Sequence, residues 1–250
     1  MPESQSETPS VGHRLWVRLS HWLITLTFFG LAFTGIEILM VHPRLYWGEV
    51  GNDLTPALIE LPISRNYKHG GWENKVAFFD GKSSPISASR TYDIFNYNGW
   101  GRSLHFLLAW LLVITGSLYL VMGLFTGHFY KHIWPRLREL TPRAIYKDIV
   151  AHLRLKNIES TPGNYNLSQR ITYALVIFWL FPVMLITGLT MSPAVTAALP
   201  FLLDWSGGLQ SARTMHFLVS VALELFLILH FVMVIVTGFK KHIVAMTVAK

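Results

Sequence analysis

The sequence predicts an all-α integral membrane protein, a four-transmembrane-helix bundle with a long periplasmic loop between its first and second helices. Composition is the first reason. Of 250 residues, 52% are hydrophobic and only 14% are charged, and the mean hydropathy is +0.39. An ordinary soluble domain of this size is less apolar. The second reason is that four stretches approach or exceed the roughly 20 apolar residues needed to cross a bilayer.

The predicted spans cover about residues 15–41, 104–125, 171–191 and 215–239, all within a single membrane domain of residues 1–250. Residues before the first span lack the basic start and cleavage site of a signal peptide, so we expect this span to be retained. The loop of residues 42–100 is rich in aromatic side chains, which favours a periplasmic cap or docking loop over disorder. In the second connection, an amphipathic stretch near residues 142–155 predicts a helix on the lipid surface.

Basic residues predict the orientation, because cytoplasmic segments of membrane proteins keep an excess of Lys and Arg. Both chain ends and the second connection are basic, whereas the loop of residues 42–100 balances its charges. We therefore expect a multi-pass protein of a bacterial inner (cytoplasmic) membrane with both termini cytoplasmic. A net charge of +7 could suggest nucleic acid, but this asymmetry explains it, so membrane lipid is the expected partner and nucleic acid is not.

The chain contains no cysteine. This excludes thiolate zinc sites, iron–sulfur clusters and covalently attached c-type haem from the chain itself. Non-covalent haem held by histidine remains possible.

Four histidines lie inside the apolar runs: His21, His105, His216 and His230. A gap of fourteen residues brings His230 back to within about 40° of the azimuth of His216, roughly 21 Å along the helix. By depth, His21 pairs with His230 in the cytoplasmic half and His105 with His216 in the periplasmic half. One such histidine could be a packing residue, but four at matched depths predict metal ligation. Two bis-imidazole haems b, without an open iron position, suit electron transfer.

Two short patterns recur in the spans. An arginine precedes a histidine or tyrosine by three residues, which places a guanidinium one turn toward the aqueous edge, where haem propionates need cations; the third copy lacks the histidine. The copies are Arg18 with His21, Arg102 with His105, Arg170 with Tyr173, and Arg213 with His216. The dipeptide Thr-Gly also recurs at residues 34–35, 115–116, 187–188 and 237–238. It suits close packing of a helix or a haem, or is simply common membrane-helix composition.

Other polar residues receive weaker predictions. Candidates near a cytoplasmic quinone pocket lie at headgroup depth beside the inner pair: His13, Arg14, Arg18, Trp22 and Lys240. Six further histidines are interpreted as solvated surface residues: His42, His69, His128, His132, His152 and His242. Glu224, near the middle of a span, must be protonated, paired or hydrated.

Four features of the spans form one pattern: the segment RLSHW at 18–22, the TG at 34–35, the histidine that opens the second span and the fourteen-residue histidine pair of the fourth. This pattern resembles that of the bacterial di-haem cytochrome b family. That family includes the b-type subunits of nickel–iron hydrogenase, formate dehydrogenase and thiosulfate reductase. The resemblance covers all four spans. It implies a respiratory-chain membrane anchor that carries electrons between the quinone pool and a periplasmic oxidoreductase subunit. His21 and His230 would ligate the cytoplasmic haem, and His105 and His216 the periplasmic one. The stretch HPRLYWGE at 42–49 departs from the shortest family members, so the resemblance does not identify the partner.

We therefore expect a di-haem b electron-transfer subunit, with no catalytic residue of its own and with a partner that could be a molybdenum oxidoreductase. Two alternatives remain. A stand-alone haem b quinone reductase could oxidise a small periplasmic species such as superoxide. A transporter or proton channel that uses Glu224 would bind no haem at all.

Overall fold

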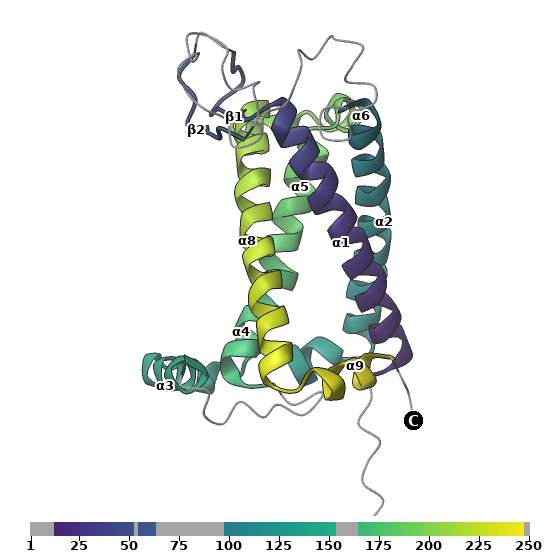
Figure 1. Ribbon diagram of the computed structural model, residues 1–250, viewed down its shortest axis with the longest axis vertical. Coiled ribbons are helices and arrows are strands. Elements are labelled where there is room, and N and C mark those ends of the chain that lie inside the picture. Colours follow the sequence, from purple (N-terminus) through teal and green to yellow (C-terminus); the bar gives the residue numbers. More distant parts are fainter. Residues whose placement is uncertain (1–12, 53–54, 64–97, 154–164, 248–250) are drawn as a thin grey trace, which may run out of the picture. The chain divides into compact units, whose positions relative to one another are not determined.

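The computed structural model describes residues 13–52, 55–63, 98–153 and 165–247. In these ranges the chain is mostly helical (Figure 1). Four helical stretches are long and apolar enough to cross a membrane: Leu15–Val41, Trp100–Phe125, Leu167–Thr190 and Leu209–Val236. The predicted all-α membrane fold is confirmed.

The first long helix, α1, runs from Leu15 to Val41, as the apolar run predicts. The second, α2, spans Asn98–Phe125 and begins before the predicted residue 104. Its extra first turn packs against α1, since a Cβ on Gly101 would collide with the carboxyl group of Glu37. Glycine at 101 therefore allows a polar turn, which apolarity alone does not reveal, to continue the helix.

The third span is an interrupted helix. It consists of α4 (Leu167–Leu175), the π-helical turn η5 (Val176–Leu180) and α5 (Phe181–Thr190). Pro182 lies in the first turn of α5. Because proline lacks an amide hydrogen and its ring clashes with the preceding turn, it disturbs the α-helical ladder just before it. The π-turn lies where this disturbance is expected.

Glycines in the left-handed region set the ends of the last helices. Helices α6 (Pro193–Ala198) and α7 (Phe201–Ser206) precede α8 (Leu209–Val236), and α9 (Phe239–Thr247) follows it. Gly207 has φ 71° and Gly208 has φ 109°, which ends α7. Gly238, with φ 113°, separates α8 from α9. The predicted span of residues 215–239 thus began too late and ended too late, because its limits followed apolarity and not these turns.

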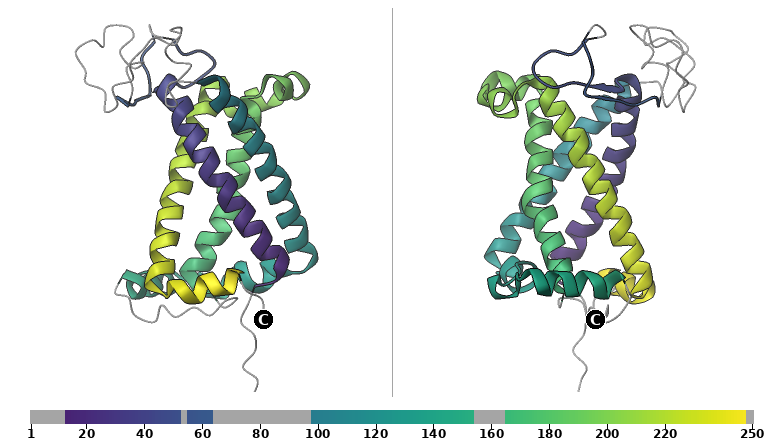
Figure 2. Two further views of the ribbon diagram at one scale, coloured as in Figure 1. Left: turned by 45° about the vertical axis from the view of Figure 1, so that its right-hand side comes forward. Right: turned by 90° about the vertical axis from the view of Figure 1, so that its left-hand side faces the viewer.

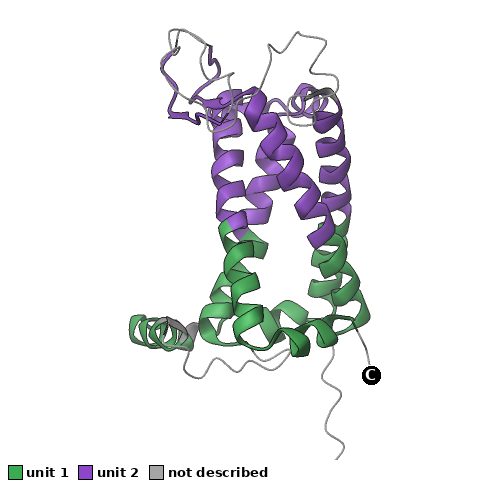
Figure 3. Cartoon of the chain, viewed as in Figure 1, with its two compact units in different colours: residues 1–24, 115–178, 225–250 green, residues 25–114, 179–224 purple. Residues whose placement is uncertain are grey.

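The chain consists of two compact units, shown in Figure 3. Unit 2 comprises residues 25–114 and 179–224, and unit 1 comprises the rest. Unit 2 contains a short antiparallel hairpin of β1 (Arg44–Leu45) and β2 (Ile59–Glu60). In it, Thr214 donates a hydrogen bond of 2.6 Å to the carbonyl of Tyr46, and the Gly48 amide donates one of 2.7 Å to Ser211. These bonds hold the hairpin against the polar first turns of α8.

Most of the predicted cap, residues 64–97 of the 42–100 loop, lies outside the described residues, as does His69. In unit 1, the described part of the second connection forms η3 (Phe129–Ile133), η4 (Leu137–Glu139) and α3 (Pro142–Leu153). Residues 142–153 of the predicted amphipathic stretch are thus helical. Helix α9 runs from the end of α8 to the start of α1 (Figure 2), where the His13 amide donates to the Ala245 carbonyl.

Candidate functional site

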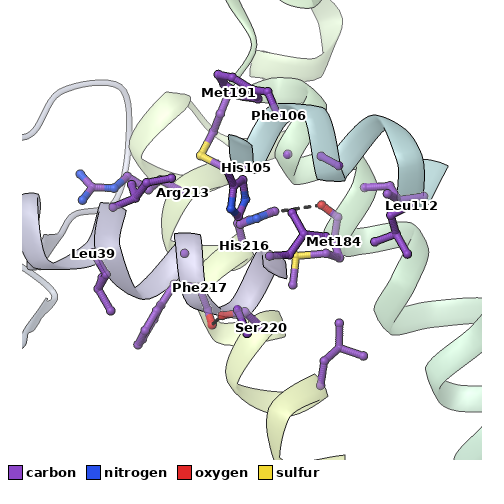
Figure 4. Close-up of a pocket in the computed structure, with 18 of the residues that line it drawn as sticks. Leu39, His105, Phe106, Leu112, Met184, Met191, Arg213, His216, Phe217 and Ser220 are labelled. Carbon is purple, nitrogen blue, oxygen red and sulfur yellow. Dashed lines mark hydrogen bonds between the residues drawn. The ribbon is translucent and has the colours of Figure 1, made fainter. Parts of the chain in front are cut away.

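His105 on α2 and His216 on α8 face each other within unit 2, and we call them the His105–His216 pair. Their ring centroids are 6.4 Å apart, and the ring planes make an angle of 66°. Both line a cavity of about 420 Å³ (Figure 4). This size is within the range of small-molecule and cofactor sites.

Each ring of this pair is held from a neighbouring helix through its Nδ1 atom. His105 Nδ1 lies 2.8 Å from the hydroxyl oxygen of Thr34 on α1. His216 Nδ1 lies 3.1 Å from the hydroxyl oxygen of Thr187 and 3.1 Å from the Met184 carbonyl, both on α5. Four helices therefore fix the orientation of the two imidazoles.

The remaining lining of this cavity is mostly apolar, with a few charged groups. Arg102 and Arg213, the predicted propionate partners, both line it. The Arg102 guanidinium lies 5.6 Å from the ring centroid of Phe106, and Arg213 donates a hydrogen bond to the carbonyl of His42. Glu224, half-buried, also lines the cavity. Both of these arginines thus line the same cavity as the His105–His216 pair.

His21 on α1 and His230 on α8 form a second pair, the His21–His230 pair, within unit 1. Their centroids are also 6.4 Å apart, with an interplanar angle of 52°. Phe226 stacks on His230 at 5.8 Å, and Trp22 meets His21 edge-on at 5.4 Å. Tyr173, which replaces the histidine in the third copy of the arginine pattern, lies 6.5 Å from His230.

The arginines of unit 1 differ in what they bind. Arg18 is buried, and it donates a 3.1 Å hydrogen bond to the Thr247 carbonyl. Its Nε is buried without a hydrogen-bond partner among the described residues. Arg170, by contrast, is paired with Glu139 at 2.9 Å and also donates to the Trp134 carbonyl. Arg18 thus retains a donor for an anionic group, whereas Arg170 is largely occupied by protein.

The spacing within each pair fits an iron atom between two imidazoles. Imidazole–metal bonds are about 2.0 Å, and ring bonds of about 1.33 Å place each nitrogen about 1.1 Å from its ring centre. Two rings on opposite sides of one metal therefore have centroids about 6.2 Å apart, close to the observed 6.4 Å. Among the described residues, no group of three or more acidic or histidine side chains is placed to bind a metal. A pair alone suits a metal whose other ligands come from a macrocycle.

Three of the predicted quinone-site residues lie together against the last turn of α9. The His13 amide bonds the Ala245 carbonyl at 3.3 Å, and the Trp22 indole donates to the Met246 carbonyl at 3.0 Å. Arg18 binds there as well, as described above. Arg14 is exposed, and Lys240 lies at the opposite end of α9, where it lines a shallow depression with Lys241.

Three histidines interpreted as solvated are in fact half-buried near the start of α1. The His128 ring lies 5.1 Å from that of His132 and 5.3 Å from that of Trp16, and Thr237 is hydrogen-bonded to His242 at 2.9 Å. Burial, with nearby positive charges, lowers the pKa of His128 to about 4. It also lowers the pKa values of His13 and His242. The spacing of four between residues 128 and 132 was a usable sequence signal for this cluster, since such residues share a helix face.

Comparison with known proteins agrees with this geometry. Residues 12–248 of the chain match the prokaryotic cytochrome b561 family. The chain belongs to this family. It is also 27% identical over 222 residues to a putative protein-methionine-sulfoxide reductase subunit YedZ1 of Azospira oryzae, which covers 89% of each chain. No solved structure matches the chain significantly. The protein is therefore a multi-pass haem b cytochrome of a prokaryotic inner membrane, and it acts in electron transfer.

Proposed function

We propose that the chain is a di-haem b subunit that carries electrons between the membrane quinone pool and a periplasmic redox partner. The equal 6.4 Å spacing of two separate histidine pairs is the observation that carries this proposal. Each pair lies within one compact unit and draws on helices distant in sequence, which argues against a chance approach of polar side chains in an apolar environment.

Haem b supplies a reversible one-electron carrier when it is bound. The chain determines how that carrier is used. His21 with His230, and His105 with His216, would hold such a group through two imidazoles each and would leave its iron closed to oxygen or substrate, which favours electron transfer. Arg102 and Arg213 in one cavity, and Arg18 beside the other pair, supply cations for propionate groups.

Quinone chemistry requires proton acceptors as well as electron carriers, because oxidation of a quinol releases two electrons and two protons. We assign this role to His13, which lies with Arg18 and Trp22 against α9. Burial and the neighbouring charged side chains lower the pKa of His13, so this imidazole is neutral at pH 7 and can accept a proton. The excess of basic residues at both ends supports a cytoplasmic location for this segment.

The periplasmic partner is an oxidoreductase subunit. The name of the YedZ1 relative refers to a reductase, and this supports a partner that consumes electrons, such as a molybdenum oxidoreductase. The loop of residues 42–100 is its docking element. Its described hairpin contacts α8 at Thr214, two residues from His216, so a partner bound there is close in sequence to a haem ligand.

The test is to purify the full chain in detergent, count protohaem per chain and add a quinol. We expect two haems, both reduced by a water-soluble quinol such as duroquinol and reoxidised only slowly without a partner. A haem-free protein would contradict the proposal and favour a transporter that uses Glu224. Rapid reduction by superoxide, with no second polypeptide, would favour the stand-alone enzyme instead.

A further inference from the structure

The ring of His105 is held by a Thr-Gly pair on α1. The Thr34 hydroxyl lies 2.8 Å from the carbonyl oxygen of Gly30, four residues earlier, and 2.8 Å from His105 Nδ1. The imidazole also makes a hydrogen bond with the backbone of Leu31. A Cβ on Gly35 would lie 3.7 Å from Cε1 of the ring, an ordinary van der Waals contact.

The ring of His216 is held by a second Thr-Gly pair, on α5, with the same pattern. The Thr187 hydroxyl lies 2.7 Å from the carbonyl oxygen of Val183, four residues earlier, and 3.1 Å from His216 Nδ1. The Met184 carbonyl, three residues earlier, is also 3.1 Å from Nδ1. A Cβ on Gly188 would be 3.2 Å from Cε1 of the ring. Two segments far apart in sequence thus form the same socket.

Counting protons in each socket determines the tautomer of its imidazole. A hydroxyl group has one hydrogen, and in both sockets a carbonyl of its own helix, which can only accept, lies at hydrogen-bonding distance. The threonine oxygen is then an acceptor toward the ring. A backbone carbonyl, also only an acceptor, is the second partner of the same imidazole. Nδ1 of His105 and of His216 therefore carries the hydrogen, and Nε2 keeps the lone pair that binds a metal.

The Thr-Gly pair at residues 237–238 makes a different contact. Thr237 is hydrogen-bonded to Nε2 of His242 at 2.9 Å, and His242 belongs to neither histidine pair. Among the described residues, His21 Nδ1 is buried and has no hydrogen-bond partner. The Nδ1 hydrogen bonds of His105 and His216 therefore have no counterpart at His21.

We propose that Thr34 and Thr187 are positioning residues that select the metal-binding tautomer of His105 and His216 and lower the reduction potential at that pair. A hydrogen bond from Nδ1–H makes the imidazole a stronger electron donor, which stabilises the ferric state of a bound iron. The inference rests on the proposed haem sites. It adds that the protein sets the potentials of its two sites apart through two hydroxyl groups.

The test is a redox titration of the purified holoprotein and of the double variant Thr34→Val with Thr187→Val. Valine keeps the shape of threonine and removes the hydroxyl oxygen, so that each Nδ1–H keeps only its backbone carbonyl as acceptor. We expect the equilibrium constant for reduction of the His105–His216 site to increase roughly tenfold. For one electron, this raises its midpoint potential by about 59 mV. The other site should not change. The variant His216→Ala, which lacks the first site, identifies which potential belongs to it.

Two further variants separate the hydroxyl from the packing. Serine at 34 and 187 keeps the oxygen and should retain the original potential. Thr190→Val is a matched control, since its hydroxyl bonds only the Ile186 carbonyl of its own helix among the described residues; it should also retain that potential. The inference is overturned if the valine variant binds haem and both midpoint potentials are unchanged. It is also overturned if the serine variant behaves like the valine variant, either in the shift of its midpoint potential or in loss of haem. Absence of haem from the unaltered protein would instead contradict the proposed function.

Discussion

Removing one histidine should remove one haem and leave the other intact. Each pair lies in a single unit and contributes both imidazoles that could hold its iron, with centroids 6.4 Å apart. Replacement of His216 by alanine removes one of the two imidazoles proposed to hold the iron and leaves a space that the remaining ring cannot bridge. We therefore expect the haem content of His216→Ala to fall from two per chain to one.

Double variants make the prediction quantitative, because ligands of one site act as a unit and ligands of different sites do not. His105→Ala combined with His216→Ala should lose no more haem than either single change, so one haem per chain remains. His216→Ala combined with His230→Ala should lose both. The same logic applies to His21. His152, in α3, belongs to neither pair, and His152→Ala is the control that should retain two.

The assay is the alkaline pyridine spectrum of each purified variant, normalised to protein concentration, with circular dichroism to confirm that the helices persist. The pairing would be refuted if the variant that combines His216→Ala with His230→Ala still held one haem. It would also be refuted by a single variant that loses both haems while its helical signal is unchanged.

Three further predictions concern neighbouring residues. Gly188→Ala places a Cβ 3.2 Å from the His216 ring, whereas Gly35→Ala places one 3.7 Å from the His105 ring. Gly188→Ala should weaken haem retention at the His105–His216 pair by about 1 kcal/mol, and Gly35→Ala should not. The measurement is haem transfer to apomyoglobin. Arg213→Gln removes a cation from the cavity and should lower the midpoint potential there, whereas Arg213→Lys should largely preserve it, as a redox titration will show. The pKa of His128 is lowered by burial to about 4, below its unfolded value of about 6.5; the unfolded chain therefore binds this proton first, and stability is lost as pH falls from about 6.5 to 4. The slope should be well under about 1.4 kcal/mol per pH unit, because the half-exposed ring is screened, and thermal unfolding of His128→Gln should show a weaker pH dependence.

The sequence alone predicted the fold class and which of the four histidines lie opposite each other. Apolar runs long enough to cross a bilayer specify helices, and basic flanks order them, so residues at the same depth can be paired without a structure. His21 with His230, and His105 with His216, follow from that reasoning alone. The pairing needed no knowledge of side-chain conformations.

Features that depend on local backbone geometry could not be obtained in this way. At the start of α8, the amides of Gln210 and Ser211 donate to the carbonyl of Gly48 in the hairpin. The π-helical turn before Pro182 depends on how the helix accommodates a missing amide. The role of Thr34 also needed the structure. Its Thr-Gly pattern was visible in the sequence, but only the structure shows that the hydroxyl is hydrogen-bonded to His105 and that Thr34 is not simply a small packing residue.

The hairpin that rests on α8 is anchored through its main chain: the bonds from this helix reach the carbonyl of Tyr46 and the amide of Gly48. Trp47, between them, is 59% exposed. Side chains on the outside of this loop can therefore vary over evolution without disturbing the turn of helix that carries His216, provided that glycine remains at 48, where φ is 100°. Under the docking role proposed for this loop, recognition of a redox partner and maintenance of the histidine pair are thus separable within a few residues.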